Sequence, residues 1–545
     1  MAEYDAATHG DMDIIFAGGG TPACVAAGRL ARANPDLKIL LVEGGRSSFE
    51  DPVVRTPALY MSHLAPESET AIPSKYLNGC EAIVPMGGIL GGGSAINFMM
   101  YTRAQGVDFD SWNTPGWTSE DILPLCKQLE TFHQDEPGID RSRHGYNGPI
   151  HVSDGGFRAR KTETLFCDTI KEMGMKEIVD LEDLNQVDGF SVVRVVFDNS
   201  NPPRATGVEC KPNAKHQPSL SFSNPVKSVI NAKKLVVVTA GTLGSPQILE
   251  RSGVGNPDVL KRVDIPVVSN VPGVGENYQD HNIIFYPYNT TLAPEETFDG
   301  IVSGRKDVSR ARAAKEPIFE AAGPAFQKCW ARDYQPFPAR PLILCCFING
   351  FLGDQNLVEP GQYITLGPTT AYPYARGSIH ITSADDVLEG YEFDNGFLSN
   401  PFDVKAQVWG YKMSREIARR LPFCKGELAL GHPAFPTRSR AALSELSYTS
   451  VAPDDKVEYS EQDDAVIEDW IRSNVNTTWH SLGTCAMKPL AKRGVVDGNL
   501  NVHGTIGLKV ADLSIGPENV GANTNGTALV IGEKAAIIIA QELGL

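Results

Sequence analysis

Residues 12–45 read MDIIFAGGGTPACVAAGRLARANPDLKILLVEGG, and this stretch decides the fold. The residues at 13–17 are mostly apolar, as expected of a strand that is buried on both faces. Three glycines follow at 18–20, and an alanine-rich pattern at about 22–33 predicts a helix. A second apolar run then closes the unit. The stretch predicts a βαβ unit whose turn binds the pyrophosphate of a dinucleotide.

The turn residues fit this chemistry. Gly18 permits a tight turn, and Gly20 lets pyrophosphate approach the start of the helix, where free N–H groups and the helix dipole favour an anion. Glu43, at the end of the second apolar run, is placed to accept from both ribose hydroxyls, so FAD or NAD is favoured over NADP. The predicted cofactor contacts are Gly18, Gly20, Thr21, Pro22, Ala23 (where the fingerprint has its third glycine) and Glu43. The alternative interpretation is an ordinary glycine-rich turn.

A second glycine cluster favours a flavin. Residues 83–103 read IVPMGGILGGGSAINFMMYTR, in which three consecutive glycines precede Ser94 and Asn97. A loop of this kind can lie flat against a planar ligand, where side chains would collide, and its N–H groups can bond to the isoalloxazine ring. An NAD enzyme has no need of a second cradle. The two clusters together therefore predict FAD.

Four stretches resemble blocks of the glucose–methanol–choline (GMC) oxidoreductase family. GGILGGGSAINFMMYTR is similar to its first signature and GTLGSPQILERSGVG, at 241–255, to its second. PGVGENYQDH at 272–281 and the block at 507–536 resemble further family segments, in the same order along the chain. Within the family, INFMMYTR, GSIHITS at 377–383 and VADLSIGPENVGANT resemble fungal alcohol (methanol) oxidases.

The resemblance implies an α/β protein (α+β overall), with a Rossmann-like FAD-binding domain and a substrate domain whose mixed or antiparallel sheet is flanked by helices. The FAD-binding domain is expected at 10–155, 189–290 and 480–545, and the substrate domain at 156–188 and 291–479. Further cofactor contacts implied by the resemblance are Gly91, Gly92, Ser94, Asn97, Met99, Val192, Ala240, Asp512, Asn525 and Thr527.

The C-terminal segment NGTALVIGEKAAIIIAQEL predicts a helix that Asn525 or Thr527 can cap. Its N-terminus can point a positive dipole at the N1–C2=O region of a flavin.

The stretch TTWHSLGTCAM, at 477–487, contains the predicted catalytic base, His480. The resemblance puts the second active-site residue at Asn523. An alcohol oxidation requires one group that removes the hydroxyl proton while hydride leaves the carbon for flavin N5, and one that holds the oxygen. A histidine suits the first task, and an asparagine amide suits the second. Taken alone, His480 is also compatible with core packing, and Asn523 with a turn before a helix.

Phe98, Met100 and Trp479 are predicted walls of a small apolar pocket that suits short primary alcohols, although core packing is an equal alternative for Met100. The leading hypothesis is an FAD-dependent alcohol oxidase that uses O2 and releases H2O2. The alternatives are a dehydrogenase with another electron acceptor, a lyase that acts on a cyanohydrin, and an inactive shortened family member. The last arises because the chain is shorter than its relatives near 190, 323 and 450.

Composition limits the partners. A chain of 545 residues is expected to form at least two domains, and a net charge of −17 argues against nucleic acid. No apolar run approaches the ~18 residues of a membrane span. Ten scattered cysteines show no metal-ligand spacing, so no metal is expected. An intracellular, cytoplasmic location is expected because neither a signal peptide nor an SKL-type ending is seen. The resemblance also allows a homo-oligomer.

Overall fold

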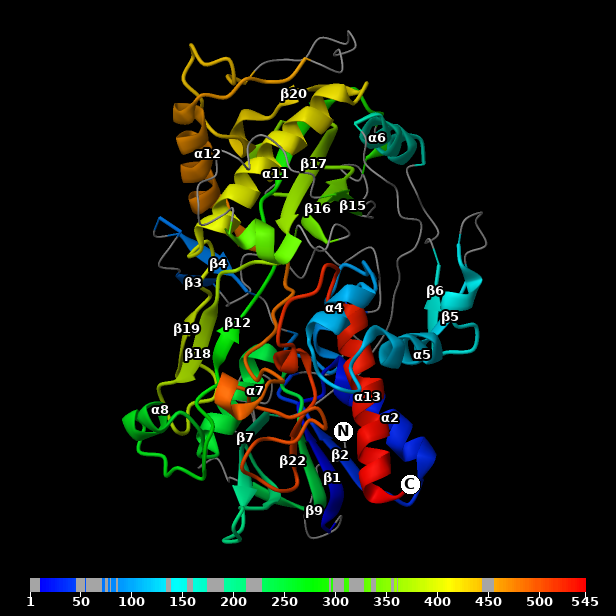
Figure 1. Ribbon diagram of the computed structural model, residues 1–545, viewed down its shortest axis with the longest axis vertical. Coiled ribbons are helices and arrows are strands. Elements are labelled where there is room, and N and C mark those ends of the chain that lie inside the picture. Colours follow the sequence, from blue (N-terminus) through cyan, green and yellow to red (C-terminus); the bar gives the residue numbers. More distant parts are fainter. Residues whose placement is uncertain are drawn as a thin grey trace.

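The chain forms an elongated molecule with one sheet toward each end (Figure 1). In the computed structural model, the described residues are 10–45, 54, 71–73, 77–78, 80–84, 87–133, 139–153, 160–173, 191–211, 228–293, 296–297, 308–312, 328–334, 340–353, 357–359, 361–443 and 455–545. No helix among them is long and apolar enough to cross a membrane. Nor do three His, Cys, Asp or Glu side chains gather as a metal site in these ranges.

The first sheet has six strands, in the order β2-β1-β9-β8-β7, with β22 paired to β9. β1 lies parallel to both β2 and β9, in a register that sets Ile15 opposite Leu40 and Val236. Ile14, Ile15 and Phe16 are fully buried, as predicted for a strand covered on both faces. The strands are β1 (Met12–Ala17), β2 (Ile39–Val42), β7 (Ser191–Phe197), β8 (Ala205–Lys211), β9 (Ser228–Val238) and β22 (Leu508–Val510).

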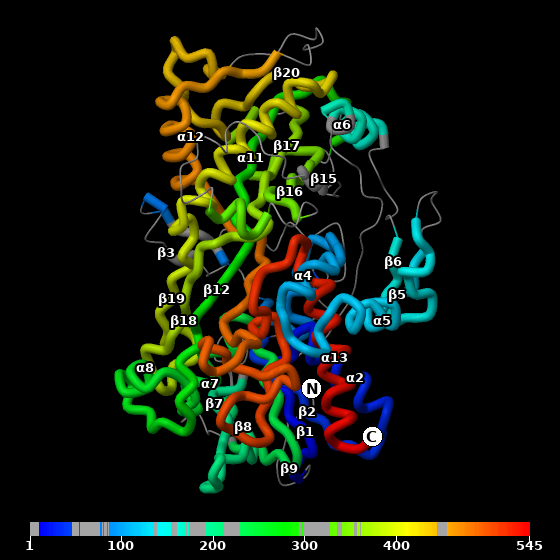
Figure 2. Tube along the Cα trace, in the orientation of Figure 1, coloured from blue at the N-terminus to red at the C-terminus, as the bar shows by residue number. Residues whose placement is uncertain are grey.

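Two helices from opposite ends of the chain pack together beside this sheet. Figure 2 shows blue α2 (Thr21–Ala33) next to red α13 (Asn525–Leu543). The close approach requires a glycine, because a Cβ at Gly532 would lie 2.7 Å from the carbonyl oxygen of Pro22. Arg29 of α2 also pairs with the buried Glu533 of α13 at 2.6 Å. The C-terminal helix therefore stabilises the start of the predicted nucleotide unit.

The same half of the molecule contains shorter elements. Its helices are α4 (Gly106–Ser111), α5 (Ser119–Leu129), α7 (Gly241–Arg251) and α8 (Pro257–Arg262), with 3-10 turns at Gly92–Ala95, Arg141–Arg143, Leu490–Lys492 and Leu513–Ile515. Two small parallel pairs join β5 (Glu130–Phe132) to β6 (Ile150–Val152), and β10 (Val254–Gly255) to β11 (Ser269–Asn270).

The second sheet has seven strands, and every neighbouring pair in it is antiparallel. Its strands are β13 (Asn282–Ile283), β14 (Tyr286–Thr290), β15 (Val308–Arg312), β16 (Pro341–Ile348), β17 (Tyr363–Thr370), β20 (Cys424–Glu427) and β21 (Asn476–Thr477). A long helix, α11 (Pro401–Arg420), packs on β16 and β17. α12 (Glu461–Asn474) and α6 (Arg160–Glu172) in turn pack against α11.

Local sequence explains where these helices begin. Asn400 caps α11 by accepting from the backbone N–H of Phe402, and Ser460 forms a capping box with Asp463 at the start of α12. A π-helical turn at Trp330–Tyr334, a 3-10 turn at Ala429–Gly431 and the hairpin of β3 (Ala71–Pro73) and β4 (Glu81–Ile83) complete this half.

A three-stranded antiparallel sheet lies between the two large sheets. It consists of β12 (Glu276–Tyr278), β18 (Gly377–Ile381) and β19 (Tyr391–Asp394). In Figure 1, β12 runs from one half of the molecule toward the other. The chain that follows β12 reaches the functional site described below.

Most predicted elements are confirmed, with one correction. The helices predicted at about 22–33 and at the C-terminus form as α2 and α13, and the strand predicted at 13–17 forms as β1. The predicted caps of α13 are wrong: Thr524 is the N-cap residue and makes no side-chain bond, whereas Asn525 and Thr527 lie inside the first turn. The domain division stays a prediction. The shortened regions at 190, 323 and 450 lie outside the described residues.

Candidate active site

A cavity of about 340 Å³ lies where segments from both ends of the chain meet. Five segments line it: the start of α2 at 20–22, the loop at 92–102, the end of β9 with the start of α7 at 239–243, the stretch 477–481, and the approach to α13 at 521–525. Residues of the antiparallel sheet, including Ile283, Leu344 and Thr369, close its other side. The glycine loops and the catalytic candidates therefore share one cavity.

The first glycine turn is built tightly. Gly18 has φ +113°, and a Cβ at this position would lie 2.4 Å from the carbonyl oxygen of Thr239. Gly20 precedes α2 and provides no side-chain cap, and Thr21 and Pro22 at the helix start line the cavity. The carboxylate of Glu43 accepts from the backbone N–H groups of Gly19 and Gly45, each at 2.9 Å.

The two glycine clusters contact each other directly. The backbone N–H of Gly91 donates to the carbonyl of Gly19 at 2.9 Å, and the Thr21 hydroxyl donates to the carbonyl of Gly91 at 3.0 Å. Gly92 has φ +55°, and a Cβ there would lie 3.1 Å from the Cα of Gly20. A Cβ at Gly93 would meet nothing within 4 Å, so this part of the loop leaves open space toward the cavity it lines. The two glycine turns, at 18–20 and 91–93, together fit a dinucleotide with a planar ring.

The cavity gathers most of the predicted cofactor contacts. Those that line it are Gly20, Thr21, Pro22, Glu43, Gly92, Ser94, Asn97, Ala240, Asp512 and Asn525. The predicted contacts outside its lining are Gly18, Ala23, Gly91, Met99, Val192 and Thr527. Ala23 is fully buried in the core and Val192 lies in β7, while the buried Thr527 hydroxyl has no hydrogen-bond partner among the described residues.

Asp512 anchors the chain beside the cavity. Its Oδ2 accepts from the backbone N–H of Gly241 at 3.0 Å and from the Ser245 hydroxyl at 2.5 Å. Burial raises the pKa of Asp512 from its usual value, while these donors oppose the shift. The carboxylate therefore ties β22 to the start of α7.

The two catalytic candidates lie side by side. Nε2 of His480 is 3.1 Å from Nδ2 of Asn523, although 43 residues separate them in sequence. The Thr102 hydroxyl accepts from the backbone N–H of Asn523 at 2.7 Å and donates to its Oδ1 at 3.0 Å. The other amide atom, Nδ2, therefore faces His480 as a donor. The predicted pair is brought together with an orientation suited to one oxygen atom.

The second ring nitrogen of His480 faces away from Asn523. Its Nδ1 lies 2.8 Å from Nδ1 of His281 and 2.8 Å from the Thr478 hydroxyl. Burial, aided by the neighbouring His281, lowers the pKa of His480 well below its ordinary value. Burial likewise lowers the pKa of His281 to about 4. Both imidazoles are therefore neutral near pH 7.

The stretch 277–281 contacts two segments: the one that carries His480 and the one that leads to Asn523. On one face, Asp280 accepts from the backbone N–H of His480 at 3.0 Å and from the Ser481 hydroxyl at 2.9 Å. The Tyr278 hydroxyl also donates to Asp280, at 3.0 Å. Burial raises the pKa of Asp280 to about 6, and its donors oppose that rise. This face fixes the His480 segment.

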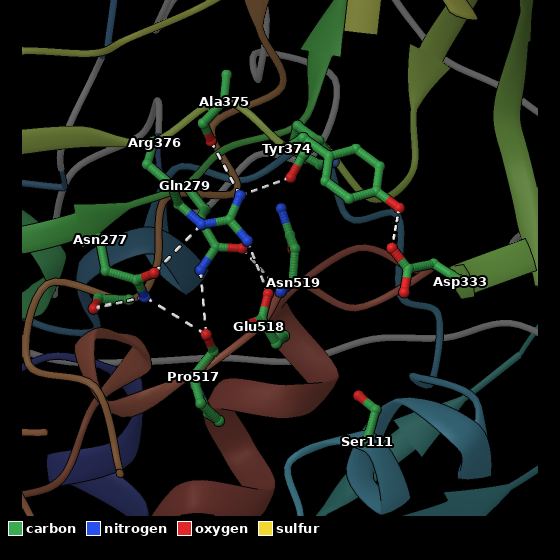
Figure 3. Close-up of polar contacts among 12 residues, drawn as sticks. Ser111, Asn277, Gln279, Asp333, Tyr374, Ala375, Arg376, Pro517, Glu518 and Asn519 are labelled. Atoms are coloured by element: carbon green, nitrogen blue, oxygen red, sulfur yellow. Dashed lines mark hydrogen bonds and ion pairs between the residues drawn. The ribbon is translucent and has the colours of Figure 1, made fainter. Parts of the chain in front are cut away.

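The other face fixes the chain that leads to Asn523. Gln279 donates to the carbonyl of Pro517 at 3.3 Å and accepts from the backbone N–H of Asn519 at 3.1 Å. Figure 3 shows the neighbouring Arg376, which donates to Asn277 at 3.2 Å and pairs with Glu518 at 2.7 Å. His281 continues the row by donating from Nε2 to the carbonyl of Val520 at 2.9 Å.

The three predicted pocket walls all line the cavity. The rings of Phe98 and Trp479 meet edge to face at 4.8 Å, and Met100 lies in the same lining. The charged side chains among the described lining residues are Glu43 and Asp512, both of which bond backbone N–H groups of the glycine and α7 turns. The remaining wall is mostly apolar.

Sequence reasoning missed three polar residues of the site: Thr102, His281 and Thr478. His281 ends the stretch PGVGENYQDH and Thr102 lies in INFMMYTR, so both belong to segments that resemble the family. The signal for His281 in the sequence is a histidine directly after an acid, Asp280, at the end of a stretch that resembles the family. Phe285, Leu344, Cys346 and Leu352 are further wall residues that were not predicted.

Comparison with known proteins gives a consistent match. The GMC oxidoreductase family matches this chain in two parts. Its N-terminal part matches residues 12–189 and 182–283, and its C-terminal part matches residues 373–532. The chain is 34% identical to the alcohol oxidase of Candida boidinii over 646 aligned positions, which cover 98% of this chain and 95% of that protein. It is 33% identical to alcohol oxidase 1 of Komagataella phaffii, with the same coverage. Because 646 positions exceed the 545 residues of this chain, these relatives carry segments that it lacks.

Solved structures show the same fold. A formate oxidase of Aspergillus oryzae superposes with a TM-score of 0.79 at 20% identity, covering 98% of this chain and 99% of that one. Pyridoxine 4-oxidase from Mesorbium loti gives 0.75 at 21% identity, covering 97% and 99%. The predicted fold class, oxidoreductase class and FAD cofactor are confirmed. With its glycine cradle and both family regions matched, the chain belongs to the GMC oxidoreductase family, as the sequence predicted.

Proposed function

We propose that the chain oxidises a small neutral primary alcohol to its aldehyde, with O2 as electron acceptor and H2O2 as second product. The net reaction is RCH2OH + O2 → RCHO + H2O2. Bound FAD supplies the acceptor for the hydride that leaves the alcohol carbon. The observation that carries the proposal is the 3.1 Å approach of His480 Nε2 to Asn523 Nδ2 in the cavity that the glycine loops line.

The two side chains offer complementary bonds to one hydroxyl group. An alcohol oxygen beside the pair, within reach of both nitrogens, accepts a hydrogen bond from Nδ2 of Asn523 and donates its proton toward Nε2 of His480. His480 is the general base in this scheme, and its low pKa keeps the imidazole unprotonated and ready near pH 7. Asn523 holds the oxygen still, so that the carbon keeps one position relative to the flavin ring.

The cavity wall supports a neutral, apolar substrate. Phe98, Met100 and Trp479 present rings and a thioether, and the two charged lining residues are already bonded to backbone N–H groups. A charged or polyhydroxylated substrate would lose hydration without gaining partners on these walls. The alcohol oxidases of two yeasts that resemble this chain along 98% of its length support both the substrate class and O2.

The test is an anaerobic spectrum of the purified protein. Addition of a short primary alcohol is expected to bleach the flavin band near ~450 nm, and aeration is expected to restore it with release of peroxide. Reoxidation by a quinone but not by O2 would contradict the oxidase assignment. A yellow protein that no alcohol bleaches would contradict alcohol oxidation itself.

His480→Ala tests the proposed base. The variant is expected to keep its yellow colour and bleach roughly 10²- to 10⁴-fold more slowly. His503→Ala is the matched control, because Nε2 of His503 donates to the backbone carbonyl of Lys488 at 3.0 Å and His503 does not line the cavity. Wild-type rates in His480→Ala would remove this residue from the mechanism.

A further inference from the structure

A row of hydrogen bonds runs from the backbone through His281 to the proposed base. The carbonyl oxygen of Val520 lies 2.9 Å from Nε2 of His281, whose Nδ1 lies 2.8 Å from Nδ1 of His480. Nε2 of His480 then faces Nδ2 of Asn523 at 3.1 Å. Each link in this row has one donor and one acceptor, so the position of every proton can be worked out.

The carbonyl of Val520 fixes the first proton of the row. A carbonyl only accepts, so Nε2 of His281 carries a hydrogen. His281 is fully buried and neutral, since burial lowers its pKa to about 4. A neutral imidazole has one N–H, so Nδ1 of His281 is a bare acceptor. The facing Nδ1 of His480 must therefore carry a hydrogen, because two lone pairs at 2.8 Å would repel.

The hydroxyl of Thr478 also requires a hydrogen on Nδ1 of His480. Its hydroxyl lies 3.3 Å from the carbonyl of His281, to which it donates. The same oxygen then has only lone pairs to offer to Nδ1 of His480, 2.8 Å away. At the opposite ring atom, Asn523 presents an N–H to Nε2, which therefore accepts. Three neighbours thus agree on one tautomer of His480.

We propose that His281 is a positioning residue that holds His480 as the Nδ1–H tautomer, so that the Nε2 lone pair faces the substrate oxygen. The inference rests on the proposed function, in which His480 is the base. The other tautomer would point an N–H at the alcohol and could not accept its proton. In many hydrolases a carboxylate performs the orienting task. In this chain a neutral imidazole performs it.

The neutral partner of His480 leaves the protonated form of this base without a counter-charge. When His480 takes a proton, the resulting cation donates from Nδ1 to a nitrogen that carries no charge. A carboxylate in that place would raise the pKa of His480, whereas His281 and burial keep it low. The groups that face the two rings are the carbonyls of Val520 and Ala371, the Thr478 hydroxyl and the Asn523 amide, none of which is charged. His480 therefore releases its proton readily after each turnover.

The first test reads the tautomer directly and needs no turnover. In the holoenzyme labelled with 15N-histidine, His480→Asn identifies the ring signals of His480 by their loss. At neutral pH, we expect a protonated Nδ1 and a bare Nε2. A protonated Nε2 would overturn the inference, whatever the activity of the protein. If His480→Ala instead keeps full activity while the tautomer is as expected, His480 is not the base, the positioning role of His281 falls with it, and only the assignment of the protons stands.

The second test uses three variants of two buried histidines. His281→Leu removes the acceptor and is expected to lower kcat about 10- to 100-fold with little change in KM. His281→Asn keeps an oxygen near the position of Nδ1 and is expected to recover most of kcat. His432→Asn is the matched control, because His432 is also buried and its Nε2 faces a backbone carbonyl, that of Pro287, at 2.9 Å.

The two variants of His281 separate positioning from folding. Retained flavin colour with a low kcat in His281→Leu, a recovered kcat in His281→Asn and a normal kcat in His432→Asn would support the inference. Equal losses in His281→Asn and His281→Leu, or a normal kcat in His281→Leu, would overturn it. If His281→Leu does not fold, His281→Asn and the tautomer of the wild-type protein still decide the matter.

Discussion

The Thr102 hydroxyl bonds Asn523 twice, by accepting from its backbone N–H at 2.7 Å and donating to its Oδ1 at 3.0 Å. The two residues are 421 positions apart in the chain. Because the hydroxyl has a single hydrogen, the first bond leaves that hydrogen for Oδ1, and the amide N–H₂ of Asn523 is turned toward His480. One threonine thus decides which end of the amide faces the base.

Replacing this hydroxyl should misorient Asn523. Thr102→Val keeps the shape but leaves the backbone N–H of Asn523 without its acceptor, which costs about 1–3 kcal/mol of unfolding free energy. The freed amide is expected to lower kcat about 10- to 100-fold, since small displacements at a reacting centre cost this much. Thr102→Ser retains the hydroxyl and should stay near the wild type in both measurements. Equal kcat values for Val and Ser would show that Thr102 does not orient the amide.

The pH dependence of the reaction should reflect the low pKa of His480. Burial and His281 hold the pKa of His480 well below its ordinary value, so the base stays unprotonated and kcat/KM should be flat from about pH 6 to 8. Asn523→Asp places a carboxylate at the atom 3.1 Å from Nε2 and raises the pKa of His480. Activity in that variant should fall as the pH is lowered through neutrality.

Asn523→Ala is the control for this experiment, because it removes the amide without adding a charge. Its kcat/KM should be lower at every pH and still flat. An acid limb near the ordinary histidine pKa in the wild type would contradict a depressed pKa at His480.

Two glycines of the nucleotide unit should respond in opposite directions to the same substitution. Gly18→Ala forces a side chain into φ +113° and sets its Cβ 2.4 Å from the carbonyl oxygen of Thr239, so loss of bound flavin is expected. Gly28→Ala, inside α2, meets nothing within 4 Å and is expected to stabilise the protein by about 0.5–1 kcal/mol. Flavin absorbance and thermal unfolding measure both effects. A yellow Gly18→Ala protein of normal stability would contradict the tight turn.

The sequence predicts the βαβ unit well because its signals are local. A buried apolar run, a glycine turn and a helical pattern all fall within 12–45, and β1, α2 and β2 form there. The pairing of His480 with Asn523 came from a family resemblance, since no local pattern joins residues 43 apart. The structure places them side by side, which the family blocks implied.

The role of 277–281 could not be predicted from the residues alone. Its side chains contact two loops that come from positions about 200 and 240 residues further along: Asp280 bonds the first, Gln279 bonds the second, and His281 bonds both. These contacts exist only once both loops are in place. The caps of α13 were wrong for a related reason: Asn and Thr both favour helix starts, and the competing Thr524 takes the N-cap position without using its side chain.

Trp479 is expected to limit the size of the alcohol. Its ring lines the cavity and meets Phe98 at 4.8 Å, and its backbone has φ +63°, which costs an L-residue about 1–2 kcal/mol. Trp479→Ala and Trp479→Gly both remove the wall, so kcat/KM for longer or branched primary alcohols should rise relative to that for the shortest ones. Only the glycine variant also relieves the backbone, so it should unfold at a higher temperature than the alanine variant, by the equivalent of about 1 kcal/mol. An unchanged ratio of kcat/KM between long and short alcohols in both variants would exclude Trp479 as a wall of the substrate pocket, because the removal of an indole that contacts the substrate cannot leave that ratio intact.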